Sequence, residues 1–147
     1  MEQWLSKLYE MTTDVDDLVG AVAFGQSRLQ QFHDALQVLE QDIQTIQHYQ
    51  HYQTTIQEHR RIMAMLHTTI QSLNSWRTQA GQHEDVLADL CAADADVSHP
   101  LVKTVRTKIA CLLGDVARHI QELQKMHAKI AMAARQLDIK KSVLQLV

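Results

Sequence analysis

The chain of 147 residues has few residues that make turns: four glycines, one proline and a single asparagine, Asn74. Chain reversals depend mostly on these residue types, so we expect few reversals and long structural elements. Glutamine and alanine are abundant, and this bias favours helix. We therefore expect an all-α protein that forms a single elongated helical domain over residues 1–147.

Cysteines and long apolar runs are also scarce. The two cysteines, Cys91 and Cys111, make neither a disulfide framework nor a metal pair, which predicts reduced thiols in the cytoplasm or the nucleus. The only compact apolar run, residues 18–24, follows three aspartates and is too short to cross a bilayer. We therefore expect a soluble chain that is not secreted and has no transmembrane segment.

Charge of each sign gathers in a different part of the sequence. The net charge is −3, but it is −6 over residues 1–50, −3 over 51–99 and +6 over 100–147. One interpretation is that an acidic helix and a basic helix face each other inside the fold. The other is that the basic helix meets nucleic acid, acidic lipid or an acidic protein.

Apolar residues in the last third recur at alternating steps of three and four, the heptad pattern of a helix with one buried face. We call such a series a seam. Pro100 suits the first turn of this helix, where its missing N–H is not needed. A loop is predicted just before it, at 91–99, where Asp94, Asp96 and Ser98 gather. The members of the seam are Val102, Val105, Ile109, Leu112, Val116, His119, Leu123, Met126, Ile130, Ala133, Leu137, Lys140 and Leu144.

The first third carries a seam of the same regularity, which also includes Gly25. An apolar stripe of this length must be covered, either by the chain itself or by another helical protein. We expect the partner to be a second copy, forming a homodimer, or another subunit of a complex. The interface candidates are Trp4, Leu8, Met11, Val15, Leu18, Val22, Leu29, Phe32, Leu36, Leu39, Ile43 and Ile46.

The middle of the chain is harder to place. Its predicted seam is out of phase with the first one across residues 47–53, and a second phase shift is predicted at Leu73. The predicted helices cover about 2–47, 54–91 and 100–146, and the first two are either separate or continuous. The stretch near residue 50 lacks glycine, proline and asparagine. We therefore prefer a long antiparallel hairpin, or coiled coil, with one helix over 14–91, and keep an elongated up-down-up three-helix bundle as the alternative. The members of the middle seam are Ile56, His59, Met63, Leu66, Ile70 and Leu73.

Nine histidines raise the question of a metal site. Bundles that hold two metal ions use Glu-x-x-His on two helices, and no histidine here has a glutamate three residues before it. His48 and His51 form an i, i+3 pair with no further ligand nearby. His59, His83 and His119 occupy seam positions, which predicts core residues. We expect no metal and no cofactor.

The sequence also lacks the motifs of common active sites. It has no Gly-x-Ser-x-Gly and no glycine-rich phosphate loop, so we predict no catalytic residue and no enzyme. The leading hypothesis is a non-catalytic helical scaffold or adaptor subunit that assembles with other proteins through coiled-coil seams. The second hypothesis is a binding module whose basic C-terminal helix docks on nucleic acid or an acidic membrane surface. Nucleic acid is the weaker choice, because no aromatic residue interleaves the nine cations of this helix.

Overall fold

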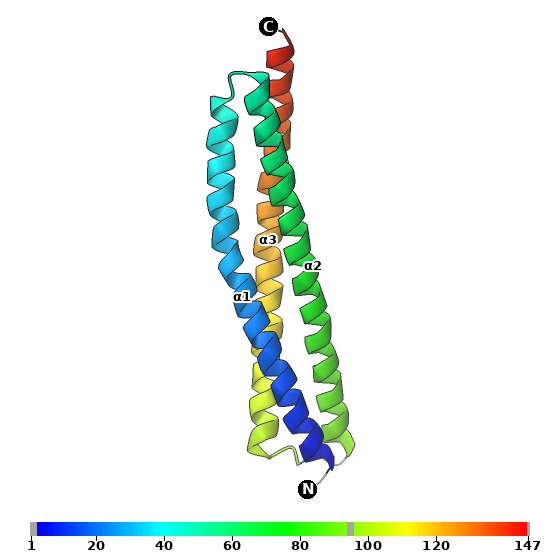
Figure 1. Ribbon diagram of the computed structural model, residues 1–147. Helices are drawn as coiled ribbons and strands as arrows, with labels where there is room; N and C mark the ends of the chain where they lie inside the picture. Colours follow the sequence, from blue (N-terminus) through cyan, green and yellow to red (C-terminus); the bar gives the residue numbers. More distant parts are fainter. Residues whose placement is uncertain (1–2, 94–95, 147) are drawn as a thin grey trace. The chain divides into compact units, whose positions relative to one another are not determined.

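The computed structural model describes residues 3–93 and 96–146, which form three long helices (Figure 1). They are α1 (Gln3–Thr45), α2 (Tyr49–Ala93) and α3 (Pro100–Leu146), and the described residues include no strand. The prediction of an all-α protein is confirmed. Within the described residues, no helix has an apolar stretch long enough to cross a membrane.

The chain reverses for the first time between α1 and α2, at residues 46–48 (Figure 1). The continuous helix predicted over 14–91 is therefore wrong, and the alternative with three separate helices is the observed one. No described residue has a positive φ, so this turn needs neither glycine nor asparagine. The His48 ring caps α2, because its Nδ1 accepts a hydrogen bond from the backbone N–H of His51 at 3.2 Å.

The loop before α3 is shorter than the predicted one, because α2 continues to Ala93. Asp94, which was predicted to lie in this loop, falls outside the described residues. The Asp96 carboxylate accepts hydrogen bonds from the Ser98 hydroxyl at 2.6 Å and from the Ser98 backbone N–H at 3.0 Å. These bonds hold the pKa of Asp96 below its ordinary value of 3.8. Pro100 is the first residue of α3, as predicted.

The helices divide into two compact units, and each unit contains one stretch of every helix. Unit 1 comprises Met1–Gln26 and Ser72–Ile120, and unit 2 comprises Ser27–Gln71 and Gln121–Val147. Unit 1 has six Lys or Arg and eleven Asp or Glu residues, a net charge of −5. Unit 2 has eight Lys or Arg and six Asp or Glu residues, a net charge of +2. The charge difference seen along the sequence is therefore also a difference between units.

The seams predicted for the first and last thirds are the buried faces of their helices. In the first seam, every member from Trp4 to Ile46 is buried except Leu29, which is half-buried. In the last seam, every member from Val102 to Leu137 is buried, and the final two, Lys140 and Leu144, are half-buried. The register that spacing assigned to these two helices is confirmed.

The seam of α2 differs from the predicted one by one residue at every second position. The structure buries Thr55, Ile62 and Thr69, whereas the predicted member one residue further along is in each case only half-buried. With this correction, the inward positions of α2 follow an unbroken alternation of three and four from Tyr52 to Leu87. The second phase shift predicted in the middle of the chain therefore does not exist.

Threonine is tolerated in this seam because its hydroxyl finds a partner within the helix. The Oγ1 atom of Thr55 donates to the carbonyl oxygen of His51 at 3.0 Å. Similarly, Oγ1 of Thr69 donates to the carbonyl oxygen of Met65 at 2.8 Å. A buried hydroxyl without a hydrogen bond would destabilise the core, whereas this local bond leaves the methyl group free to pack.

The core of unit 1 shows how the three helices meet. Trp4 and Leu8 of α1 belong to one cluster with Leu87 of α2 and Val102 of α3. Each helix contributes seam residues to this cluster, so within unit 1 the seam of each helix is covered by the other two. Full burial of a side chain of this size stabilises the fold by about 1.5–3 kcal/mol, which makes the seams the main source of stability.

Candidate interaction surfaces

The twelve predicted interface residues lie in the interior of the chain itself. Eleven are buried and Leu29 is half-buried. The prediction that they form an interface rested on an apolar stripe that must be covered, either by the chain itself or by another helical protein. Because α2 and α3 cover that stripe, the physical reason for placing a second chain there no longer applies. A binding surface must be sought among the exposed residues.

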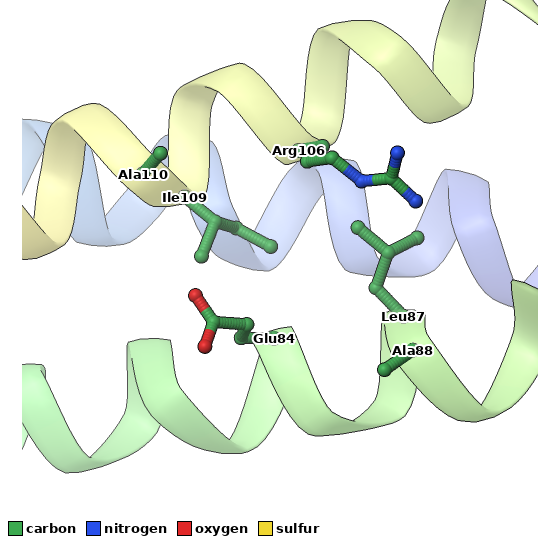
Figure 2. A pocket seen from close by; sticks show the side chains of 6 residues that line it. All are labelled: Glu84, Leu87, Ala88, Arg106, Ile109 and Ala110. Atoms are coloured by element: carbon green, nitrogen blue, oxygen red, sulfur yellow. The ribbon is translucent and has the colours of Figure 1, made fainter.

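Unit 1 has an open groove between α2 and α3, with a volume of about 230 Å³ (Figure 2). Leu87 and Ile109 are buried residues that line it. Ala88 and Ala110 also line it, and their short side chains leave space between the two helices. The groove therefore has an apolar lining that can accept a side chain of another molecule.

Two charged side chains lie at different ends of this groove. Figure 2 shows the Glu84 carboxylate beside Ile109 and the Arg106 guanidinium beside Leu87. Arg106 Nη2 donates a long hydrogen bond to Sγ of Cys91 at 3.5 Å. The groove can thus hold an apolar group between charges of opposite sign. It does not bring an acid and a base together on one reacting atom.

A second surface lies on α3 in unit 2, where four exposed apolar residues follow one another at heptad spacing. They are Met132, Ile139, Val143 and Leu146, with exposed fractions of 61%, 63%, 52% and 87%. We call this series the α3 stripe. Gln136 completes its alternation of four and three residues. At 3.6 residues per turn, the stripe lies on the side of α3 opposite the buried seam.

Cationic side chains flank the α3 stripe on both sides. At 3.6 residues per turn, Lys129 and Lys140 lie about 60–80° from Met132 on one side, and Arg135 lies about 60° away on the other. None of these three cations forms an ion pair among the residues that the structure describes. By contrast, Lys108 in unit 1 is paired with an aspartate of α1 at 2.9 Å. The flanking cations are therefore available to a partner.

A groove of about 430 Å³ between α1 and α3 adjoins the stripe in unit 2. Met132 belongs to both features, and Lys129 lines the groove beside it. On the α1 side the lining includes Leu36, which is buried, and Glu40, which is exposed. A helix that lies along the stripe could therefore place one side chain in this groove.

The histidines considered as metal ligands have other contacts. His48 and His51 have ring centroids 5.9 Å apart, and Nδ1 of His48 is engaged in capping α2. His67 of α2 and His127 of α3 meet edge to face in unit 2, with centroids 5.0 Å apart. Among the described residues, no group of three or more His, Cys, Asp or Glu side chains is placed to hold a metal ion.

Two of the three histidines predicted to be core residues are buried. His59 is buried in unit 2, where its Nε2 lies 2.8 Å from the carbonyl oxygen of Ile130. A carbonyl oxygen only accepts, so this nitrogen carries the proton and donates it. His119 is also buried, and its Nε2 has no hydrogen-bond partner among the described residues. His83 is half-buried.

The α3 stripe was not predicted from the sequence, although a signal for it exists. Met132, Ile139, Val143 and Leu146 repeat the spacing of a seam, but they are out of phase with the seam at Ile130. An α-helix with two such series on opposite sides exposes one of them unless it is buried on all sides. A search for a second series on each helix would have found the stripe.

Comparison with known proteins does not add a family. No protein-family model, no curated protein and no solved structure matches this chain.

Proposed function

We propose that this protein is a non-catalytic helical scaffold or adaptor subunit that binds an amphipathic helix of a partner protein along the α3 stripe. The observation that carries the proposal is the heptad spacing of four exposed apolar residues, Met132, Ile139, Val143 and Leu146. An exposed series with this spacing matches the side-chain spacing of a partner helix, so that knobs of one helix enter holes of the other.

The size of the α3 stripe indicates a modest affinity. Burying the exposed part of four such side chains contributes roughly 4–8 kcal/mol in total, at about 1.5–3 kcal/mol for each full side chain. Association costs at least about 4 kcal/mol in lost motion, so the stripe alone supports only weak binding. The adjoining groove and the flanking cations are therefore needed for a stable complex. This requirement favours a helical partner whose charges match.

The remaining parts of the proposal rest on composition. Four glycines and no nucleophile motif support a non-catalytic role. Two free thiols, half-buried Cys91 and exposed Cys111, support a reducing compartment, the cytoplasm or the nucleus.

A selection for helical peptides that bind the full chain tests the proposed surface. We expect the selected peptides to carry apolar residues at i, i+3 or i+4, and i+7, and to lose binding when Ile139→Asp places a charge in the stripe. The matched control is Val38→Asp, an exposed position on α1 in the same unit that lies outside the stripe. Circular dichroism confirms that both variants remain folded. If the peptides bind the Ile139→Asp variant with the same affinity as the parent chain, the proposed surface is wrong.

A further inference from the structure

On α3 itself, the charged residues nearest the stripe on each side are cations. Lys129, Arg135 and Lys140 occupy its flanks, and none of them has an ion-pair partner among the described residues. Asp138, the acid nearest to the stripe in sequence, lies further from it than these cations, at about 120° from Met132 around the helix, and Glu122 precedes the stripe along α3. In helix pairs, the residues that flank the apolar seam select the partner through their charge.

We propose that the partner helix carries acidic residues on both sides of its apolar face, and that it belongs to a different protein rather than to a second copy of this chain. This inference rests on the proposed function, because it names the partner of the same surface. Its basis is charge complementarity: carboxylates opposite the three cations form ion pairs, whereas amines there repel them.

A second copy fits this surface poorly. If two α3 stripes paired, in either direction, the cations beside one stripe would face the cations beside the other. The remaining helices offer no substitute. Among the described residues, the exposed large apolar residues of α1 are Tyr9, Val19, Phe24 and Val38, and those of α2 are Tyr49, Met65 and Val86. Neither set forms a continuous series at heptad spacing. No other exposed seam on the described part of the chain can therefore dock on the stripe.

An anionic membrane or nucleic acid also fits less well than an acidic helix. Phosphates would satisfy the cations but leave the apolar centre of the stripe against a charged backbone. A lipid surface could accept the stripe, yet the exposed carboxylate of Glu40 lines the adjoining groove and would approach the same anionic surface. A helix can instead place a lysine or a polar residue opposite Glu40 while its acids meet the cations.

Two labelled synthetic peptides of about three heptads test this inference on the full chain. Both carry leucine on one face, and the flanking positions hold glutamate in one peptide and lysine in the other. Fluorescence anisotropy measures each dissociation constant at low and high salt. We expect the glutamate peptide to bind about tenfold more tightly at low salt, the effect of three exposed ion pairs of ordinary strength, and the preference to shrink at high salt.

Variants separate this inference from the proposed function. Arg135→Glu combined with Lys140→Glu should reverse the preference without abolishing binding, and Ile139→Asp should weaken both peptides alike. If both peptides bind the parent chain equally, or the lysine peptide binds more tightly, the inference is wrong although the proposed surface stands. If neither peptide binds, or if Ile139→Asp changes nothing, the proposed surface itself is wrong.

Two further measurements address the excluded partners. Light scattering reports the mass of the full chain, and a dimer that dissociates on Ile139→Asp would identify a second copy as the partner and overturn the inference. Co-sedimentation with vesicles of phosphatidylcholine and phosphatidylserine tests the membrane. If the chain binds the vesicles more tightly than it binds the glutamate peptide, and Ile139→Asp abolishes the vesicle binding, the inference is likewise overturned. A monomeric mass together with no co-sedimentation with the vesicles supports the inference.

Discussion

Replacing Ile62 with alanine is expected to destabilise the protein more than the same replacement at Ile70. Both residues lie on α2 in unit 2. Ile62 is only 2% exposed, whereas Ile70 is half-buried. The sequence pattern placed Ile70 in the seam and left Ile62 out of it, so the comparison tests the corrected register of α2 directly.

The magnitude follows from the carbon atoms that leave the core. Isoleucine to alanine removes three carbons, which at about 0.8 kcal/mol each amounts to about 2.4 kcal/mol at a fully buried site. The cavity that remains adds to this value, and buried replacements of this kind cost about 2–5 kcal/mol in total. We expect about 3 kcal/mol for Ile62→Ala. At Ile70 part of the side chain already contacts water, and about 1 kcal/mol is expected.

Urea denaturation followed by far-UV circular dichroism measures both free energies of unfolding. The gain in helix propensity from isoleucine to alanine is the same at both positions, so it cancels in the comparison. The midpoints are comparable only if the slope with urea is unchanged. If Ile70→Ala costs as much as Ile62→Ala or more, α2 does not bury the face that contains Ile62, and the register predicted from the spacing of apolar residues is correct.

Three further predictions concern helix propensity, the seam of α3 and one carboxylate. A Cβ at Gly20 or Gly114 meets no atom within 4 Å, so each glycine-to-alanine change should raise the free energy of unfolding by about 0.5–1 kcal/mol in a denaturation experiment. Leu123→Asp places a charge at a fully buried position of α3 and should abolish cooperative thermal unfolding near the parent midpoint; an unchanged midpoint would contradict the assigned seam. Hydrogen bonds from Arg61 hold the pKa of Glu58 below its ordinary value of 4.5, so this pair stabilises the fold above pH 4.5 and the contribution is lost as pH falls through the lowered pKa. An NMR titration should show the pKa rise on Arg61→Ala, and no rise would mean that the ion pair is absent in solution.

The sequence alone was sufficient for the fold class and for two of the three buried faces. The spacing of apolar residues is a local property of a helix, and it identifies the inward side wherever one series is clearly more apolar than its neighbours. This condition holds for the first seam and for the last one. Pro100 marked the start of α3 for an equally local reason, since its missing N–H costs nothing in the first turn.

Only the tertiary structure could place the inward face of α2. Two series compete there, and the one that contains Ile56 and Ile70 is the more apolar. Packing selects the other one, because Thr55 and Thr69 stay in phase with the later positions of the helix and bond their hydroxyls to carbonyls of their own backbone. A count of apolar residues treats threonine as polar, because it does not include the hydrogen bond that the hydroxyl forms within its own helix.

The reversal after α1 and the exposure of the α3 stripe were likewise decided by the tertiary structure. The His48 side chain caps α2 after the turn. The sequence around it contains no glycine, proline or asparagine that would have predicted a turn there. On α3 the sequence contains a second, shorter apolar series on the side opposite the buried seam, and its pattern alone does not tell whether that side is covered as well. Burial depends on which surfaces the neighbouring helices can cover at once, and that is a property of the assembled bundle rather than of any one segment.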